Sequence, residues 1–105
     1  MTAKDLINML PAAFNADAAG GEDLTVQFNV STPMTGKISG GACTVSDGVA
    51  DNADLTITME DDDFIQLMKG ELNGMQAFMT GKLKLDGNIM LAQKLGAFFD
   101  ASKLG

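Results

Sequence analysis

Residues 55–70 read LTITMEDDDFIQLMKG, and the spacing of their apolar residues changes halfway along. Leu55, Ile57 and Met59 alternate with threonines, which predicts a strand with one buried face and one wet face. From Phe64 onward the apolar residues recur at helical spacing, behind a run of four acids. Carboxylates suit a helix start because they cap free N–H groups and complement the helix macrodipole. A strand followed directly by a helix is therefore expected here.

Similar alternation predicts the other strands. It is cleanest in LTVQFNVS, residues 24–31, where every second residue is apolar. Five strands are predicted, near residues 24–31, 34–39, 42–46, 54–59 and 82–86. Their solvent face is predicted to carry Thr25, Gln27, Asn29, Thr56, Thr58, Lys82 and Lys84. Because every well-patterned strand has one polar face, we expect a five-stranded mixed or antiparallel sheet covered by helices on one face only.

About four to five helices complete this α+β fold. They are predicted at residues 3–14, between Glu60 and Gly70, at 73–80, and after an N-cap at Asn88. Thr2 is a plausible N-cap for the first helix, whereas Pro11 can kink or shorten it. Residues 15–23 are small and polar and predict a loop. The length and the lack of a visible linker predict a single domain, 1–105.

The charge balance restricts the possible partners. The chain has 14 acids, seven lysines and no histidine, for a formal net charge of −7. An acidic surface repels phosphate backbones, so nucleic acid is not an expected partner. It also argues against tight binding to anionic membranes through a polybasic patch, which leaves at most a transient membrane contact.

The residues that usually carry out catalysis are largely missing. Without histidine, the usual general base near neutral pH is absent, and Cys43 has no imidazole partner. Cys43 is expected to be a small, half-buried hydrophobe. The consecutive acids of residues 60–63 do not match a calcium loop, and one cysteine cannot supply a typical zinc site. We expect no catalytic residue, no metal site and no cofactor.

The single cysteine and the ends of the chain suggest a location. One cysteine cannot form an internal disulfide, which fits a reducing compartment, and no secretory segment is visible at the N-terminus. A cytoplasmic protein is expected. Ser102-Lys103-Leu104 has the letters of a peroxisomal address, but Gly105 follows it. A peroxisomal location is expected only if Gly105 is not native.

Phenylalanine and methionine are in surplus, with six and eight residues, and many of them fall in the second half of the chain. Methionine lines irregular or adaptable cavities well, although it also fills gaps in ordinary cores. From this pattern alone, a dry core and a lipid-holding cavity are equally good interpretations.

Two segments resemble the sterol carrier protein 2 family. Residues 53–70 share its alternating Thr-rich strand, acidic helix start, phenylalanine and closing glycine. Residues 77–88, AFMTGKLKLDGN, are similar to the family run A-F-x-x-G-K-L-x-[IV]-x-G-[ND], and residues 92–95 continue it as A-x-K-L. The chain departs from the family in lacking a tryptophan in the second strand and in carrying Gly74 in place of a common proline.

The resemblance implies a non-catalytic lipid-binding or lipid-transfer domain with an apolar tunnel between the sheet and the helices. The implied ligands are fatty acids, acyl-CoAs, phospholipids or sterols. The residues predicted to line the tunnel are Phe28, Ile57, Met75, Phe78, Met79, Met90, Leu91, Leu95, Phe98 and Phe99. Two alternatives remain. The first is an accessory factor that presents a lipidic intermediate, such as a quinone precursor, to partner enzymes. The second is an interaction domain with a dry core, which could form a homodimer.

Overall fold

The computed structural model describes residues 2–88, 90–91, 94 and 98–99. The helices are α1 (Ala3–Ala13), α2 (Ala16–Ala19), α3 (Asp61–Met68) and α4 (Gly74–Met79). The strands are β1 (Leu24–Asn29), β2 (Met34–Ser39), β3 (Ala42–Asp47), β4 (Leu55–Thr58) and β5 (Lys84–Gly87). Among the described residues, no helix is long and apolar enough to span a bilayer.

The five strands form one mixed sheet in the order β3-β2-β1-β4-β5. Only β1 and β4 are parallel, and the other neighbours run antiparallel. Phe28 in β1 lies opposite Met34 in β2 and Ile57 in β4, so three large apolar residues meet at the centre of the sheet. The predicted α+β class with a five-stranded mixed sheet is confirmed.

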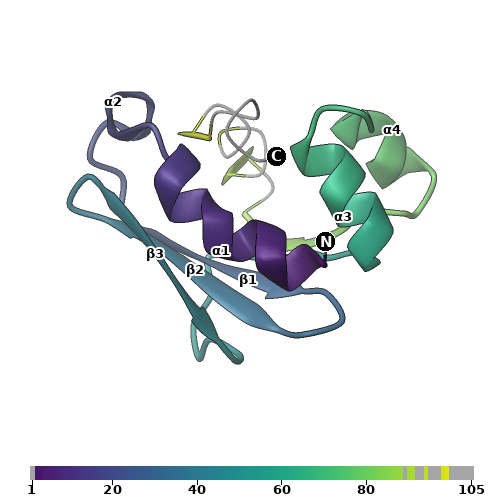
Figure 1. Cartoon of the computed structure of the whole chain (residues 1–105), viewed down its shortest axis with the longest axis horizontal. Helices are drawn as coiled ribbons and strands as arrows, with labels where there is room; N and C mark the ends of the chain where they lie inside the picture. Colours follow the sequence, from purple (N-terminus) through teal and green to yellow (C-terminus); the bar gives the residue numbers. More distant parts are fainter. Residues whose placement is uncertain (1, 89, 92–93, 95–97, 100–105) are drawn as a thin grey trace.

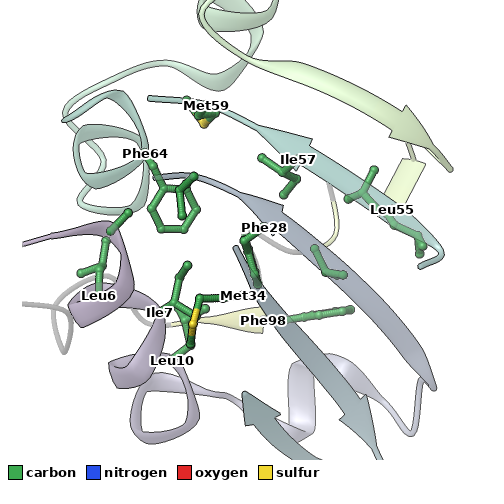
Figure 2. Close-up of a cluster of buried hydrophobic side chains, with 14 of the residues drawn as sticks. Leu6, Ile7, Leu10, Phe28, Met34, Leu55, Ile57, Met59, Phe64 and Phe98 are labelled. Carbon is green, nitrogen blue, oxygen red and sulfur yellow. The ribbon is translucent and has the colours of Figure 1, made fainter. Parts of the chain in front are cut away.

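The helices lie on one face of the sheet, with α1 running across it (Figure 1). Leu6, Ile7 and Leu10 of α1 are completely or almost completely buried, because these three residues form an apolar stripe on one side of the helix. The sheet contributes its own buried side chains to the same core, among them Phe28 and Ile57, and Figure 2 shows the two layers facing each other. α1 continues through Pro11 to Ala13, so the proline does not end the helix.

Phe64 connects α3 to this core. Its ring is buried and meets the Phe28 ring edge-on, with 5.6 Å between the ring centroids. The Phe28 ring also lies over Gly36 in β2, where an added Cβ would stand 2.9 Å from the ring. The glycine therefore leaves the space that the aromatic pair occupies.

On the second face of the sheet, the burial of Gln27 differs from the prediction. This side chain was expected to face solvent, yet it is buried. The connection from β3 to β4 crosses this face, because β4 must reach the far side of β1. Gln27 donates to the carbonyl of Gly48 and accepts from the N–H of Ala50, at 3.4 and 2.6 Å. The prediction is wrong here because the covering segment is irregular and has no hydrophobic period.

Two other boundaries differ from the expectation. The expected loop at residues 15–23 contains the short helix α2, whose N–H groups are capped by the Asn15 side chain. Lys82 lies before β5 rather than in it, because its N–H and that of Leu83 both bond to the carbonyl of Ala77. Lys82 therefore belongs to the turn after α4 and not to the solvent face of the sheet.

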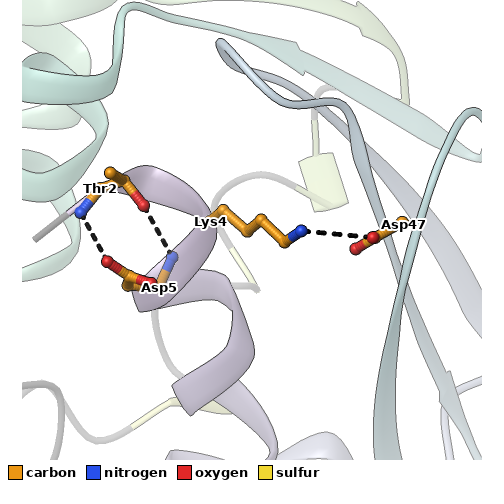
Figure 3. A network of polar contacts seen from close by, with 4 residues as sticks. All are labelled: Thr2, Lys4, Asp5 and Asp47. Carbon is orange, nitrogen blue, oxygen red and sulfur yellow. Dashed lines mark hydrogen bonds and ion pairs between the residues drawn. The ribbon is translucent and has the colours of Figure 1, made fainter.

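The start of α1 is capped as predicted. The Thr2 hydroxyl accepts from the Asp5 N–H, and the Asp5 carboxylate accepts from the Thr2 N–H, at 3.2 and 3.0 Å (Figure 3). Hydrogen bonding to the Asp5 carboxylate, first from the Thr2 N–H and then from the Thr2 side chain, holds the pKa of Asp5 below its ordinary value. Lys4 pairs with Asp47 at the end of β3, at 3.3 Å, but both are exposed enough that the pair contributes little.

Asp61 ties three elements together at the start of α3. Its carboxylate accepts from the N–H and the hydroxyl of Ser31, at 2.9 and 2.7 Å, and from the N–H of Ala3, at 3.4 Å. Partial burial by itself raises the pKa of Asp61. The three hydrogen bonds outweigh it and hold the pKa below the ordinary value of 3.8.

We expect Asp61→Asn to lower the free energy of unfolding by roughly 1 kcal/mol at neutral pH, because a neutral amide is a weaker acceptor. A carboxyl whose folded pKa is lowered stabilises the protein above its unfolded pKa, and this contribution is lost as the pH falls through the folded pKa. The difference between Asp61→Asn and the unmutated protein should therefore shrink below about pH 4. Urea unfolding at neutral and acidic pH measures it.

Asp62→Asn is the matched control, since it removes the same charge from the same helix turn at an exposed position. Equal losses in the two variants would mean that the helix dipole, and not the Ser31 and Ala3 bonds, accounts for the effect.

Candidate functional site

The region predicted to hold a ligand lies between the sheet and the second half of the chain. On the sheet side, Phe28 and Ile57 are buried next to each other in neighbouring strands. Leu91 and Phe98 are buried as well, and all four belong to one hydrophobic cluster. The structure thus brings these four predicted residues together in a common apolar interior.

The segment after β5 packs back onto the end of α1. The Phe99 ring lies 5.8 Å from the Phe14 ring, centroid to centroid, and the carbonyl of Phe98 accepts from the N–H of Asn15 at 2.7 Å. The Asn88 side chain accepts from the Met90 N–H, as expected of an N-cap, and Met90, Leu91, Lys94 and Phe98 are helical. Half-buried Phe99 therefore lies at the rim of the cluster near α1.

Four further predicted residues are exposed. Met75, Phe78, Met79 and Met90 have 71%, 47%, 79% and 65% of their surface accessible. Leu95 lies outside the described residues. The predicted lining therefore separates into a buried group and an exposed group, and its role in ligand binding stays a prediction.

The orientation of α4 explains the exposed group. Asn73 caps the helix by accepting from the N–H groups of Met75 and Gln76. Ala77 is fully buried, and its carbonyl accepts two backbone bonds from the turn that follows. Gly74 approaches Leu67 of α3 closely, since a Cβ added at Gly74 would lie 3.4 Å from that side chain. α4 is therefore held by its small residues, and its large ones face outward.

Several core residues were not among the predicted lining residues. Leu6, Ile7 and Leu10 from α1, with Phe64 from α3, cover the sheet centre around Phe28 (Figure 2). The helical spacing from Phe64 onward could have identified Phe64, and the apolar stripe of residues 3–14 could have identified the three α1 residues. That stripe identified a buried helix without indicating which strands it covers.

The region contains little reactive chemistry. Cys43 is half-buried in β3, and this burial raises the pKa of its thiol to about 11, so almost no thiolate is present near neutral pH. Across the part of the chain that the structure describes, no group of three or more potential metal-ligating side chains is found. The described residues of this region can supply apolar contact and main-chain hydrogen bonds.

Comparison with known proteins gives relatives over part of the chain. The peroxisomal multifunctional enzyme A of Dictyostelium discoideum is 54% identical over 50 residues, 48% of this chain and 11% of that protein. Human sterol carrier protein 2 is 58% identical over 43 residues, 41% of this chain and 8% of that protein. The chain thus spans only about a tenth of the length of these relatives.

Solved structures share the fold. The solution structure of palmitated SCP2L2 from Aedes aegypti has a TM-score of 0.67 at 24% identity, covering 92% of this chain and 93% of that one. The sec-alkylsulfatase Pisa1 from Pseudomonas sp. contains a similar unit, with a TM-score of 0.81 at 21% identity over 87% of this chain and 15% of that one. The ubiquinone synthesis protein UbiJ-SCP2 has a TM-score of 0.64 at 21% identity, covering 89% of this chain and 78% of that one. At these identities the likeness concerns the fold alone.

The family model described as the SCP-2 sterol transfer family matches residues 7–100. This range includes every strand of the sheet, all of α2, α3 and α4, and most of α1. Because the match extends over nearly the whole chain, the chain belongs to the SCP-2 sterol transfer family.

Proposed function

We propose that this chain is a non-catalytic lipid-binding and lipid-transfer domain that holds one ligand between its sheet and its second-half helices. The observation that carries this proposal is the family match over residues 7–100. The buried cluster of Phe28, Ile57, Leu91 and Phe98 supports it, because these side chains offer apolar contact with no ionised group among them. The ligand classes are fatty acid, acyl-CoA, phospholipid or sterol-like molecule.

The energetics of such a ligand are favourable. Burying about 14 methylenes at about 0.8 kcal/mol each contributes roughly 11 kcal/mol to the binding free energy, before the cost of association is subtracted. Association costs on the order of 4 kcal/mol or more, which leaves an affinity of roughly micromolar strength. An apolar site with few polar groups recognises chain length and bulk more than head-group chemistry.

The non-catalytic part of the proposal is supported by the chemistry of the chain. The sequence has no histidine, and the one thiol is half-buried with a raised pKa. The relatives with enzyme names are about ten times longer than the matched region, so their activities can reside elsewhere. The reducing environment that one unpaired cysteine favours leads us to propose a cytoplasmic location.

A second candidate is an accessory factor that presents a lipidic biosynthetic intermediate, such as a quinone precursor, to partner enzymes. The fold it shares with UbiJ-SCP2 and the exposed apolar side chains of α4 favour this candidate. Native mass spectrometry of protein purified from cells, followed by lipid extraction, separates the candidates. An ordinary fatty acid or phospholipid supports the carrier, a prenylated aromatic supports the accessory factor, and a mass without ligand supports an interaction domain with a dry core.

Leu91→Trp tests whether the buried cluster admits a lipid. If a ligand site adjoins Leu91, the indole fills it. A fluorescent fatty acid should then be displaced, and the free energy of unfolding should change by less than about 0.5 kcal/mol. We expect this result in a fatty-acid titration combined with urea unfolding. In a closed core the same substitution would overpack the interior and lower the free energy of unfolding by roughly 1–3 kcal/mol.

Val49→Trp is the control, because Val49 is 72% exposed in the connection between β3 and β4. It should alter neither stability nor fatty-acid binding. Strong destabilisation by Leu91→Trp, together with no fatty-acid binding by the unmutated protein, would mean that the buried cluster is a dry core without a ligand site.

Cys43 is expected to react slowly with thiol reagents. A pKa of about 11 instead of the ordinary 9.0 reduces the thiolate fraction at mildly alkaline pH about a hundredfold. The rate of modification by a disulfide reagent should therefore be well below that of free cysteine and should rise until the pH reaches about 11. Unfolding in guanidinium should restore the ordinary rate. A native thiol that reacts as fast as free cysteine would contradict the burial and reopen a chemical role for Cys43.

A further inference from the structure

Met75 and Met79 lie one turn apart on the outward side of α4. They are spaced i and i+4, so they share one side of the helix, and 71% and 79% of their surfaces are accessible. Phe78 is exposed on the same side, whereas the inward contact of α4 is made by the small residue Ala77. α4 itself lies at the outer side of α3 (Figure 1). Two thioether side chains are therefore open to solvent on one helical turn.

The other described methionines are less accessible, apart from Met90, which is 65% exposed. Met34 and Met59 are buried in the core, with 1% and 6% of their surfaces accessible. Met9 and Met68 are half-buried and pack against that core. An oxidant dissolved in water therefore reaches α4 and Met90 long before it reaches the core.

Access decides which methionine is oxidised, because a thioether needs neither deprotonation nor a catalytic group in order to react. Hydrogen peroxide transfers one oxygen atom to the sulfur. A sulfur lone pair forms the S–O bond, the O–O bond breaks, and the other peroxide oxygen leaves as water with both protons. The sulfur is oxidised by two electrons and the peroxide is reduced by two. The product, methionine sulfoxide, is polar, whereas the thioether is apolar.

Cys43 competes poorly for the same oxidant. Peroxide reacts with a thiolate rather than with a thiol, and burial raises the pKa of the Cys43 thiol to about 11. Almost no thiolate is therefore present near neutral pH. The exposed methionines are thus the more reactive sulfurs in the part of the chain that the structure describes.

We propose that Met75 and Met79 form a site of reversible oxidation, at which peroxide turns the outward side of α4 from apolar to polar while the domain stays folded. Methionine oxidation disrupts a protein when the sulfoxide has to fit into a core. Here both side chains are exposed. α4 is held in place by buried Ala77 and by the Asn73 cap, and neither contact uses a methionine side chain.

The exposure of this site also allows the reaction to be reversed. A methionine sulfoxide reductase removes the oxygen as water, with two electrons and two protons from a dithiol that becomes a disulfide. Such an enzyme reaches a sulfoxide on the outward side of α4 without unfolding the domain. A contact that depends on this apolar side is thus weakened by oxidation and restored by reduction. The inference needs only the exposed side chains, so it does not depend on the proposed lipid site.

Limited treatment of the full chain with hydrogen peroxide, followed by peptide mapping in a mass spectrometer, tests this site. Each oxygen adds about 16 Da, and we expect Met75 and Met79 to be oxidised at least roughly tenfold faster than Met34 and Met59. Retention on a hydrophobic-interaction column should fall, whereas the midpoint of urea unfolding should not change. Reductases for both sulfoxide epimers, supplied with dithiothreitol, should restore the mass and the retention.

Two pairs of substitutions separate the chemistry of the sulfur from the polarity of the surface. Met75→Leu with Met79→Leu removes the oxidisable sulfurs but keeps apolar side chains of similar size, so most of the retention should survive peroxide. Met75→Gln with Met79→Gln imitates the polar product and should lower the retention without peroxide. Met90→Leu is the control, since it removes a similarly exposed sulfur outside α4 and should leave the loss of retention in place.

The inference is overturned by any of four results. The first is oxidation of Met34 as fast as that of Met75, and the second is a urea midpoint that falls as Met75 and Met79 are oxidised. The third is a pair of sulfoxides that the reductases cannot remove from the folded protein. The fourth is a loss of retention that Met90→Leu abolishes, because the polar change would then lie outside α4.

Discussion

The edge-on contact between the Phe64 and Phe28 rings joins α3 to the centre of the sheet, and the rest of the core is arranged around it. Gly36 makes this contact possible because a side chain there would collide with the Phe28 ring. Leu6 and Ile7 of α1 lie on the same side of the sheet (Figure 2). Two helices far apart in sequence thus cover one strand, and this leaves α4 outside the most closely packed part of the core.

Polar groups at the edges of the core hold the layers in place. Asp61 connects the start of α3 to the turn after β1 and to the start of α1, and Gln27 holds the β3–β4 connection against the second face of the sheet. Within the described residues, every buried side-chain nitrogen or oxygen has a hydrogen-bond partner. Because an unpaired buried polar group costs about as much as a lost hydrogen bond or more, the bonds of buried Gln27 favour this one path for the β3–β4 connection.

The distribution of apolar side chains links this architecture to lipid chemistry. The family match covers nearly the whole chain, while the large residues of α4 face outward. A domain that exchanges a lipid must be stable in water and must also give the lipid an environment similar to that of acyl chains. An apolar interior supplies the second of these, and the rest of the surface remains in water.

The sequence by itself determined the strands, most of the helices, the caps at Thr2 and Asn88, and the family. These depend on neighbours within a few residues, where hydrophobic period and capping chemistry act directly. Only the tertiary structure decided that Gln27 is buried and that Met75, Phe78 and Met79 face away from Phe28. A helical period shows which residues share a face. Which face turns inward depends on competition for the limited area of the sheet, and here α1 and α3 covered its centre while Ala77, small enough to pack closely, became the buried side of α4.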